Sequence, residues 1–190
     1  MAKIYEFLAD GFEDIEALAP VDILRRGGVE VKTVSITGNA FVTSAHGVTV
    51  KADMEFTSPE DYADADMLLL PGGMPGAANL KAHAGVRQAM TAQYENGKRI
   101  GAICAAPMVL GSLGLLRNKR ATCYPGFETY LDGAEYTATL VEQDGLVTTG
   151  EGPAAALPYA YHILSFFADT DTVAALKDGM MYTHLMTSHR

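Results

Sequence analysis

The sequence RIGAICAAP, residues 99–107, combines the features of a buried strand, a cysteine and a helix start. Ile100 and Ile103, with two small residues between them, are typical of a central parallel strand that is covered on both faces. The alanines that follow and Pro107, which the first turn of a helix tolerates, predict a helix directly after Cys104. A side chain at such a turn lies at the carboxyl edge of the sheet, where open α/β sheets bind ligands and helix N-termini stabilise anions. Cys104 is therefore a candidate nucleophile, and the alternative is a small buried hydrophobe.

Apolar strands and helical segments alternate along the rest of the chain. Pro20 falls inside the first helical segment and predicts a kink or a later start of that helix. The alternation predicts a three-layer, doubly wound α/β fold with a mostly parallel, flavodoxin-like sheet and one domain, residues 1–190. We expect strands at 4–9, 29–36, 67–70, 100–103 and 121–124, two more within 137–149, a β-hairpin at 40–52, and helices at 13–27, 80–94, 105–114, 154–168 and 170–179.

Composition and charge narrow the class of protein. Hydrophobic residues make up 48% of the chain and charged residues 19%, which is typical of a folded globular protein. The net charge of -9, from 23 acids against 14 bases, argues against a nucleic-acid or anionic-membrane partner. Two cysteines give no disulfide framework, and no apolar run is long enough to span a bilayer. The N-terminus enters a strand without a signal peptide, so we expect a cytoplasmic protein.

Three segments are predicted to meet at one edge of the sheet: the acidic helix start at 13–16, the Gly72-Gly73 loop and the Cys104 turn. A carboxyl group beside a thiol controls its ionisation, and backbone amides in a glycine loop can bind an oxyanion. The five histidines have no zinc-type spacing, and the glycine loop lacks the lysine and hydroxyl of a phosphate loop. We therefore expect a small-molecule site that uses no metal and no cofactor.

Five motifs occur in order along nearly the whole chain: LADGFEDIE (8–16), PVDILRRG (20–27), LPGG (70–73), AICAAP (102–107) and DGLVTT (144–149). In these motifs the sequence resembles the ThiJ/PfpI family of the class I glutamine amidotransferase-like superfamily. The likeness is strongest to the branch of the parkinsonism-associated protein and its bacterial relatives.

The resemblance implies a role for each matched residue. Cys104 matches the reactive cysteine on a strained elbow, and Glu16 matches the acid that hydrogen-bonds its sulfur and favours the thiolate. Gly73 and Ala105 match the residues whose backbone amides form the oxyanion hole, with Gly72 beside them in the pocket. The resemblance also implies a homodimer packed near the site.

The chain departs from the family pattern at three positions. Tyr124 and Ala105 stand where branches of the family carry histidine, and a phenol is a poor general base at neutral pH. Chemistry that needs a proton shuttle is therefore weakened, proteolysis most of all. Glu151 stands where the related protein has arginine, which disfavours anionic substrates and raises the pKa of a nearby thiol.

Three functions stay open at this point. The first is a cysteine-dependent enzyme, of hydrolase or lyase type, that acts on small reactive carbonyls or their adducts in a glyoxalase- or deglycase-like way. The second is a redox sensor or protective chaperone that oxidises Cys104, with Cys123 as a possible resolving cysteine. The third is a peptidase-like or small-molecule-binding member without histidine-assisted catalysis. Glu6, in a strand expected to be central, predicts a basic partner or exposure at a strand end, and the methionines of residues 180–190 predict a cover for a core edge or a dimer neighbour.

Overall fold

A seven-stranded sheet forms the centre of the computed structural model, which describes residues 1–188. Its strands run in the order β10-β11-β7-β6-β1-β2-β5, and every neighbouring pair is parallel except β10 and β11. In chain order the elements are β1 (Lys3–Leu8), α1 (Asp14–Arg26), β2 (Glu30–Ser35), β3 (Phe41–Thr43), β4 (Thr49–Lys51), β5 (Met54–Glu55), the 3-10 helix η1 (Pro59–Tyr62), β6 (Met67–Leu70), α2 (Gly76–Ala82), α3 (Ala84–Glu95), β7 (Arg99–Ile103), α4 (Pro107–Ser112), β8 (Arg120–Ala121), η2 (Glu128–Tyr130), β9 (Glu135–Tyr136), β10 (Val141–Asp144), β11 (Val147–Gly150), η3 (Pro153–Ala155), α5 (Ala156–Leu164), α6 (Thr170–Gly179) and α7 (Tyr182–Thr187).

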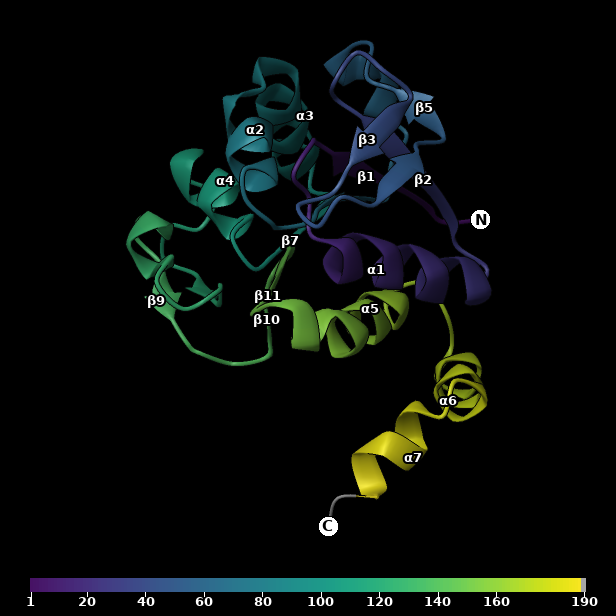
Figure 1. Ribbon diagram of the computed structural model, residues 1–190. Coiled ribbons are helices and arrows are strands. Elements are labelled where there is room, and N and C mark those ends of the chain that lie inside the picture. Colours follow the sequence, from purple (N-terminus) through teal and green to yellow (C-terminus); the bar gives the residue numbers. More distant parts are fainter. Residues whose placement is uncertain (189–190) are drawn as a thin grey trace.

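Helices cover both faces of this sheet, as Figure 1 shows. Helices α1 and α5 pack together on one face, and α2, α3 and α4 lie on the other. All four residues of β6 are buried, as a central strand requires. The prediction of a mostly parallel α/β sheet flanked by helices is confirmed, and so is the β3–β4 hairpin.

The strand order places the candidate site. From β1 the chain moves to β2 on one side of it, and later to β6 and β7 on the other side. The carboxyl ends of β1, β6 and β7 therefore meet where the strand order reverses, and open α/β sheets bind ligands at such a point. The segments that follow these three strands carry Glu16, Gly72 and Cys104, respectively.

Some local predictions are wrong. Of the expected strand 121–124 only Ala121 is paired: it belongs, with Arg120, to the two-residue strand β8, whose partner is the short strand β9. The expected helix 80–94 is two helices that meet at His83, whose Nδ1 accepts the Val86 N–H at 3.1 Å and caps α3. The later start predicted from Pro20 is also wrong: helix α1 begins at Asp14 and includes Pro20, because the Glu13 carboxylate accepts the Glu16 N–H and fixes the helix start upstream.

Glu6 also differs from its prediction. It is 1% exposed on β1, so it does not reach solvent at a strand end. Arg25 is the charged group that lowers its pKa, but the Arg25 guanidinium hydrogen-bonds the Val31 carbonyl and Asp53 instead. Burial prevails and raises the pKa of Glu6 well above its ordinary value.

The C-terminal segment forms two helices beyond the sheet, α6 and α7 (Figure 1). Sequence patterns predicted α6 but not α7. Met180 packs against the core, as expected of a cover for a core edge, whereas Met181 and Met186 are exposed. Positions 189–190 of the expected C-terminal cover lie outside the described residues. Among residues 1–188, no helix combines the length and apolar character that crossing a membrane requires.

Candidate active site

Cys104 occupies a sharp turn between β7 and α4. Its backbone has φ of +63°, in the left-handed region that residues with a side chain rarely adopt. Two backbone hydrogen bonds hold this conformation: the Cys104 N–H donates to the Gly150 carbonyl, and the Tyr124 N–H donates to the Cys104 carbonyl, both at 2.9 Å. The residue is 8% exposed. The turn therefore holds the thiol in one position at the carboxyl end of β7.

Glu16 lies in the first turn of α1 and is fully buried. Its Oε2 accepts the Gly72 N–H at 3.0 Å, which ties α1 to the loop after β6. The pKa of Glu16 is raised to about 7, mainly by burial; the Cys104 thiol and the Gly72 amide lower it, and the Glu13 carboxylate raises it. Near neutral pH this carboxyl group can therefore hold or release a proton.

The ionisation of Cys104 depends on that of Glu16. Burial raises the pKa of the Cys104 thiol, and an ionised Glu16 beside it raises that pKa further. The backbone amides of Gly73 and Ala105 act in the opposite direction, because both lie against the sulfur and stabilise a thiolate. A thiolate therefore requires Glu16 to keep its proton, so that the pair carries one negative charge.

The two loop glycines permit this close packing. A Cβ on Gly72 would lie 2.5 Å from Glu16 Oε2 and 2.7 Å from the Cys104 Cβ. Gly73 has φ of +86°, and a Cβ there would collide with the Glu13 backbone nitrogen. A side chain at either position would push the loop away from the sulfur, and with it the Gly73 amide.

The other residues predicted for the site lie around the same turn. Tyr124, which is 46% exposed, packs its ring edge-on against Phe127, and a Cβ on Gly152 would lie 3.1 Å from the Tyr124 ring. Cys123 is a fully buried free thiol. Burial raises the pKa of Cys123 to about 12, and the charges of Glu128 and Glu151 contribute in the same direction. Cys123 is thus far less ready to ionise than a typical thiol.

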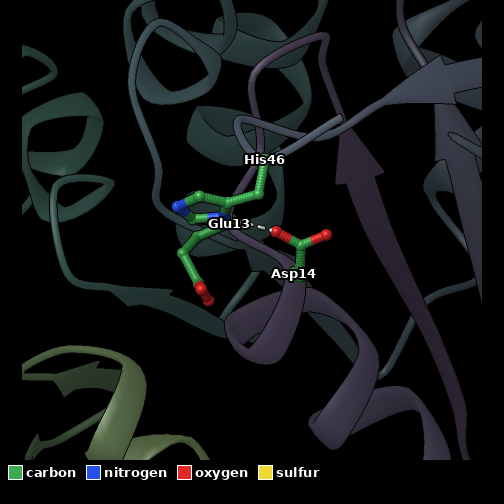
Figure 2. Close-up of side chains that lie close together, drawn as sticks. All are labelled: Glu13, Asp14 and His46. Carbon is green, nitrogen blue, oxygen red and sulfur yellow. Dashed lines mark hydrogen bonds and ion pairs between the residues drawn. The ribbon is translucent and has the colours of Figure 1, made fainter. Parts of the chain in front are cut away.

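A histidine that sequence spacing did not place near the site does lie near it. His46, in the β3–β4 turn, forms an ion pair with Asp14 at 2.7 Å over the start of α1 (Figure 2). The hairpin is held there by hydrogen bonds from the Gly11 N–H to the Thr43 carbonyl and from the Ala45 N–H to the Phe12 carbonyl. No local motif links residue 46 to residue 14, so only the fold reveals this pair.

Glu13, Asp14 and His46 form a cluster of side chains of the kinds that bind metal ions. One donor atom from each of Glu13, Asp14 and His46 lies within 4.8 Å of the others. One Glu13 oxygen already caps α1 by accepting the Glu16 N–H, and Asp14 is paired with His46. The cluster therefore serves the start of α1 and the hairpin as it stands.

Comparisons with known proteins agree with the geometry. Residues 2–165 match the DJ-1/PfpI family. Protein DJ-1 homolog B of Arabidopsis thaliana is 36% identical over 162 residues, which are 83% of this chain and 36% of that protein. The chain thus spans well under half the length of this relative, and 41% of a second Arabidopsis relative.

Other relatives match over most of their length. A deglycase of Pyrococcus horikoshii is 33% identical over 158 residues, 80% of this chain and 91% of that protein. The crystal structure of DJ-1beta from Drosophila melanogaster superposes with a TM-score of 0.88 at 30% identity, and covers 95% of this chain and 97% of that one. With these matches and a cysteine on a strained elbow beside a buried glutamate, the chain belongs to the DJ-1/PfpI family.

Proposed function

We propose that this protein is a cysteine-dependent enzyme that acts on small reactive carbonyls or their adducts, in a glyoxalase- or deglycase-like way. The observation that carries the proposal is the placement of Cys104 against three groups: the Glu16 carboxyl and the backbone amides of Gly73 and Ala105. These are the nucleophile, the acid and the oxyanion donors that addition to a carbonyl needs. The deglycase of Pyrococcus horikoshii supports the same class of chemistry.

The first step follows from the geometry. The Cys104 thiolate attacks the aldehyde carbon, and a carbon–sulfur bond forms while the carbonyl π electrons move to oxygen. The amides of Gly73 and Ala105 are placed to hold this oxyanion, and Glu16 gives it a proton, which yields a neutral hemithioacetal. Because the pair shares one charge, the Glu16 that faces a thiolate is the protonated form that this step needs.

The substrate class follows from the access and charge of the site. Cys104 is 8% exposed, so only a compact electrophile reaches its sulfur. Glu16 is next to the sulfur, and Glu151 directly follows Gly150, whose carbonyl accepts the Cys104 N–H. We therefore favour neutral carbonyls such as methylglyoxal over anionic ones.

The test is consumption of methylglyoxal by the wild type, Cys104→Ser and Cys123→Ser. The wild type and Cys123→Ser are expected to consume methylglyoxal, and Cys104→Ser is expected to consume it more slowly by on the order of 100-fold or more. If the wild type is as inert as Cys104→Ser, or if Cys104→Ser is as active as the wild type, the proposed cysteine-dependent activity is excluded.

A redox-sensing role is the second candidate, and the same amides favour it. Hydrogen peroxide attacked by the Cys104 thiolate would give a sulfenate and water, and a second equivalent would give a sulfinate. The Gly73 and Ala105 amides at the sulfur are donors for these oxygens. Intact-mass analysis after mild peroxide should then show oxygen on Cys104 before any methionine is oxidised. Oxidation of the exposed Met181 or Met186 first would count against this role.

A further inference from the structure

A line of residues crosses the sheet beneath helices α1 and α5. In the parallel registers Glu6 of β1 pairs with Leu69 of β6, Leu69 pairs with Gly101 of β7, and Gly101 pairs with Thr148 of β11. Residues paired across neighbouring strands point to the same face of a sheet. The face is that of α5, because Tyr159 of this helix lies over Gly101.

Two glycines make room for Tyr159. A Cβ on Gly101 would lie 2.5 Å from the Tyr159 hydroxyl, and a Cβ on Gly150 would lie 3.1 Å from its ring. The phenol therefore lies against β7 and β11, next to the strand residue whose carbonyl accepts the Cys104 N–H. Tyr159 is 1% exposed, so its hydroxyl is buried over Gly101, on the strand that leads to Cys104.

Polar atoms in this layer are buried without partners. Among the residues that the structure describes, Glu6 Oε2, the Tyr159 hydroxyl, Thr148 Oγ1 and Glu16 Oε1 form no protein hydrogen bond of normal geometry. All four residues are at most 1% exposed. An unsatisfied buried polar group is costly, and internal water molecules are the usual partners of such groups.

Both acids lie on the side of the sheet that carries Tyr159: Glu6 is on the face that α5 covers, and Glu16 belongs to α1, which packs against α5. Burial raises the pKa of Tyr159, and the charges of Glu6 and Glu16 raise it further. The charged group facing Glu6 from α1 is Arg25, and the groups facing Glu16 are Glu13 of the α1 cap and Cys104 of the elbow. Tyr159 is thus a buried group whose ionisation depends on both the acid on β1 and the acid of the active site.

We propose that Glu6, Tyr159 and Glu16 bind internal water molecules between the sheet and helices α1 and α5, and that this hydrogen-bonded network solvates the Glu16–Cys104 pair. Tyr159 is a positioning residue in this network, since it acts on the sulfur through Glu16. The network stabilises the single negative charge of the pair, a charge that burial alone penalises. The functional half of the proposal rests on the proposed nucleophile, whereas the water site does not.

The test combines a structure with a titration. A high-resolution crystal structure of the wild type should show ordered water within hydrogen-bond distance of the Tyr159 hydroxyl and Glu6. The Tyr159→Phe variant keeps the shape of the ring and removes the hydroxyl, so the midpoint of Cys104 alkylation by iodoacetamide should rise by about half a pH unit or more, a roughly threefold loss of thiolate at pH values well below the midpoint. Glu6→Leu should shift the midpoint in the same direction, and the isosteric Glu6→Gln should restore the wild-type value.

Tyr161→Phe is the matched control, because Tyr161 is also buried on α5 but its hydroxyl bonds to the Met180 sulfur. It should titrate like the wild type. The proposal is overturned if no water density appears at Tyr159 and Glu6, or if Tyr159→Phe titrates like the wild type. Neither readout needs turnover, so a protein that fails to consume methylglyoxal but shows both effects contradicts the proposed function alone.

Discussion

The backbone amide of Gly72 binds Oε2 of Glu16 at 3.0 Å, and the missing side chain of Gly72 makes this contact possible. A Cβ at this position would lie within 2.7 Å of both Glu16 and Cys104. One glycine therefore fixes the acid and leaves the nucleophile room beside it.

Replacing Gly72 with alanine should damage both stability and reactivity. The added methyl group displaces the Glu16 carboxyl, and overpacking of this kind lowers the free energy of unfolding by about 1–3 kcal/mol. Urea denaturation measures this loss, and the rate of Cys104 alkylation should change with it. Gly179→Ala is the control, since a Cβ there meets nothing within 4 Å and its φ is not positive. Equal stability of the two variants would contradict the packing described.

Glu16 should make the folded protein less stable as pH rises. Its folded pKa of about 7 lies above the ordinary value of 4.5, so between these values the folded state binds more protons than the unfolded state. The stability contributed at low pH is lost as pH rises through this window, by up to about 3 kcal/mol. Glu16→Gln removes the effect, so wild type minus variant, measured by urea denaturation at pH 5 and pH 8, isolates it. A difference that does not change with pH would contradict a buried, proton-holding Glu16.

The ion pair between His46 and Asp14 should be visible by NMR. Asp14 raises the pKa of His46, so the imidazole should titrate above its usual 6.5 in the wild type and nearer to it in Asp14→Asn. His83 provides an internal reference, because burial lowers its pKa and Asp14 has no part in that. If His46 titrates identically in both proteins, the hairpin does not hold the imidazole against α1.

Glu151 should select against anionic reagents at Cys104. We expect Glu151→Gln to raise the rate ratio of iodoacetate to iodoacetamide by roughly two- to threefold, because a carboxylate near the sulfur repels the anion. Glu95→Gln, at an exposed position on α3, should leave the ratio unchanged. A ratio that is the same in both variants would show that Glu151 does not act at the site.

Sequence patterns predicted the sheet well because its signals are local. The apolar residues of Met67–Leu70 and of the strand before Cys104 indicate that both strands are buried, and the Gly72-Gly73 motif marks the loop that follows the first of them. The points at which helices and strands end are harder to predict. His83 divides one continuous helical pattern into α2 and α3, because its ring accepts the Val86 N–H and caps α3. Residues 121–124 have strand propensity, but only Ala121 among them is paired with another strand.

The candidate site was predictable only in part. Its main residues are marked by family motifs, whereas the His46–Asp14 pair joins segments 32 residues apart that no motif links. The sequence marks Glu6 as unusual in a strand, but its relation to Tyr159 depends on the register of β1, β6 and β7 and on the path of α5. Contacts of this kind arise from tertiary packing and have no period in the sequence.

The rate of Cys104 alkylation as a function of pH, in the wild type and in Glu16→Gln, tests the central claim most directly. If one charge is shared by the pair, the reactive thiolate should appear as the pair loses its first proton, at a lower pH in the wild type than in Glu16→Gln. In Glu16→Gln the thiol ionises alone in a buried site, so the midpoint should move above the ordinary thiol value of about 8.5. Identical profiles for the two proteins would contradict the claim that Glu16 controls the nucleophile.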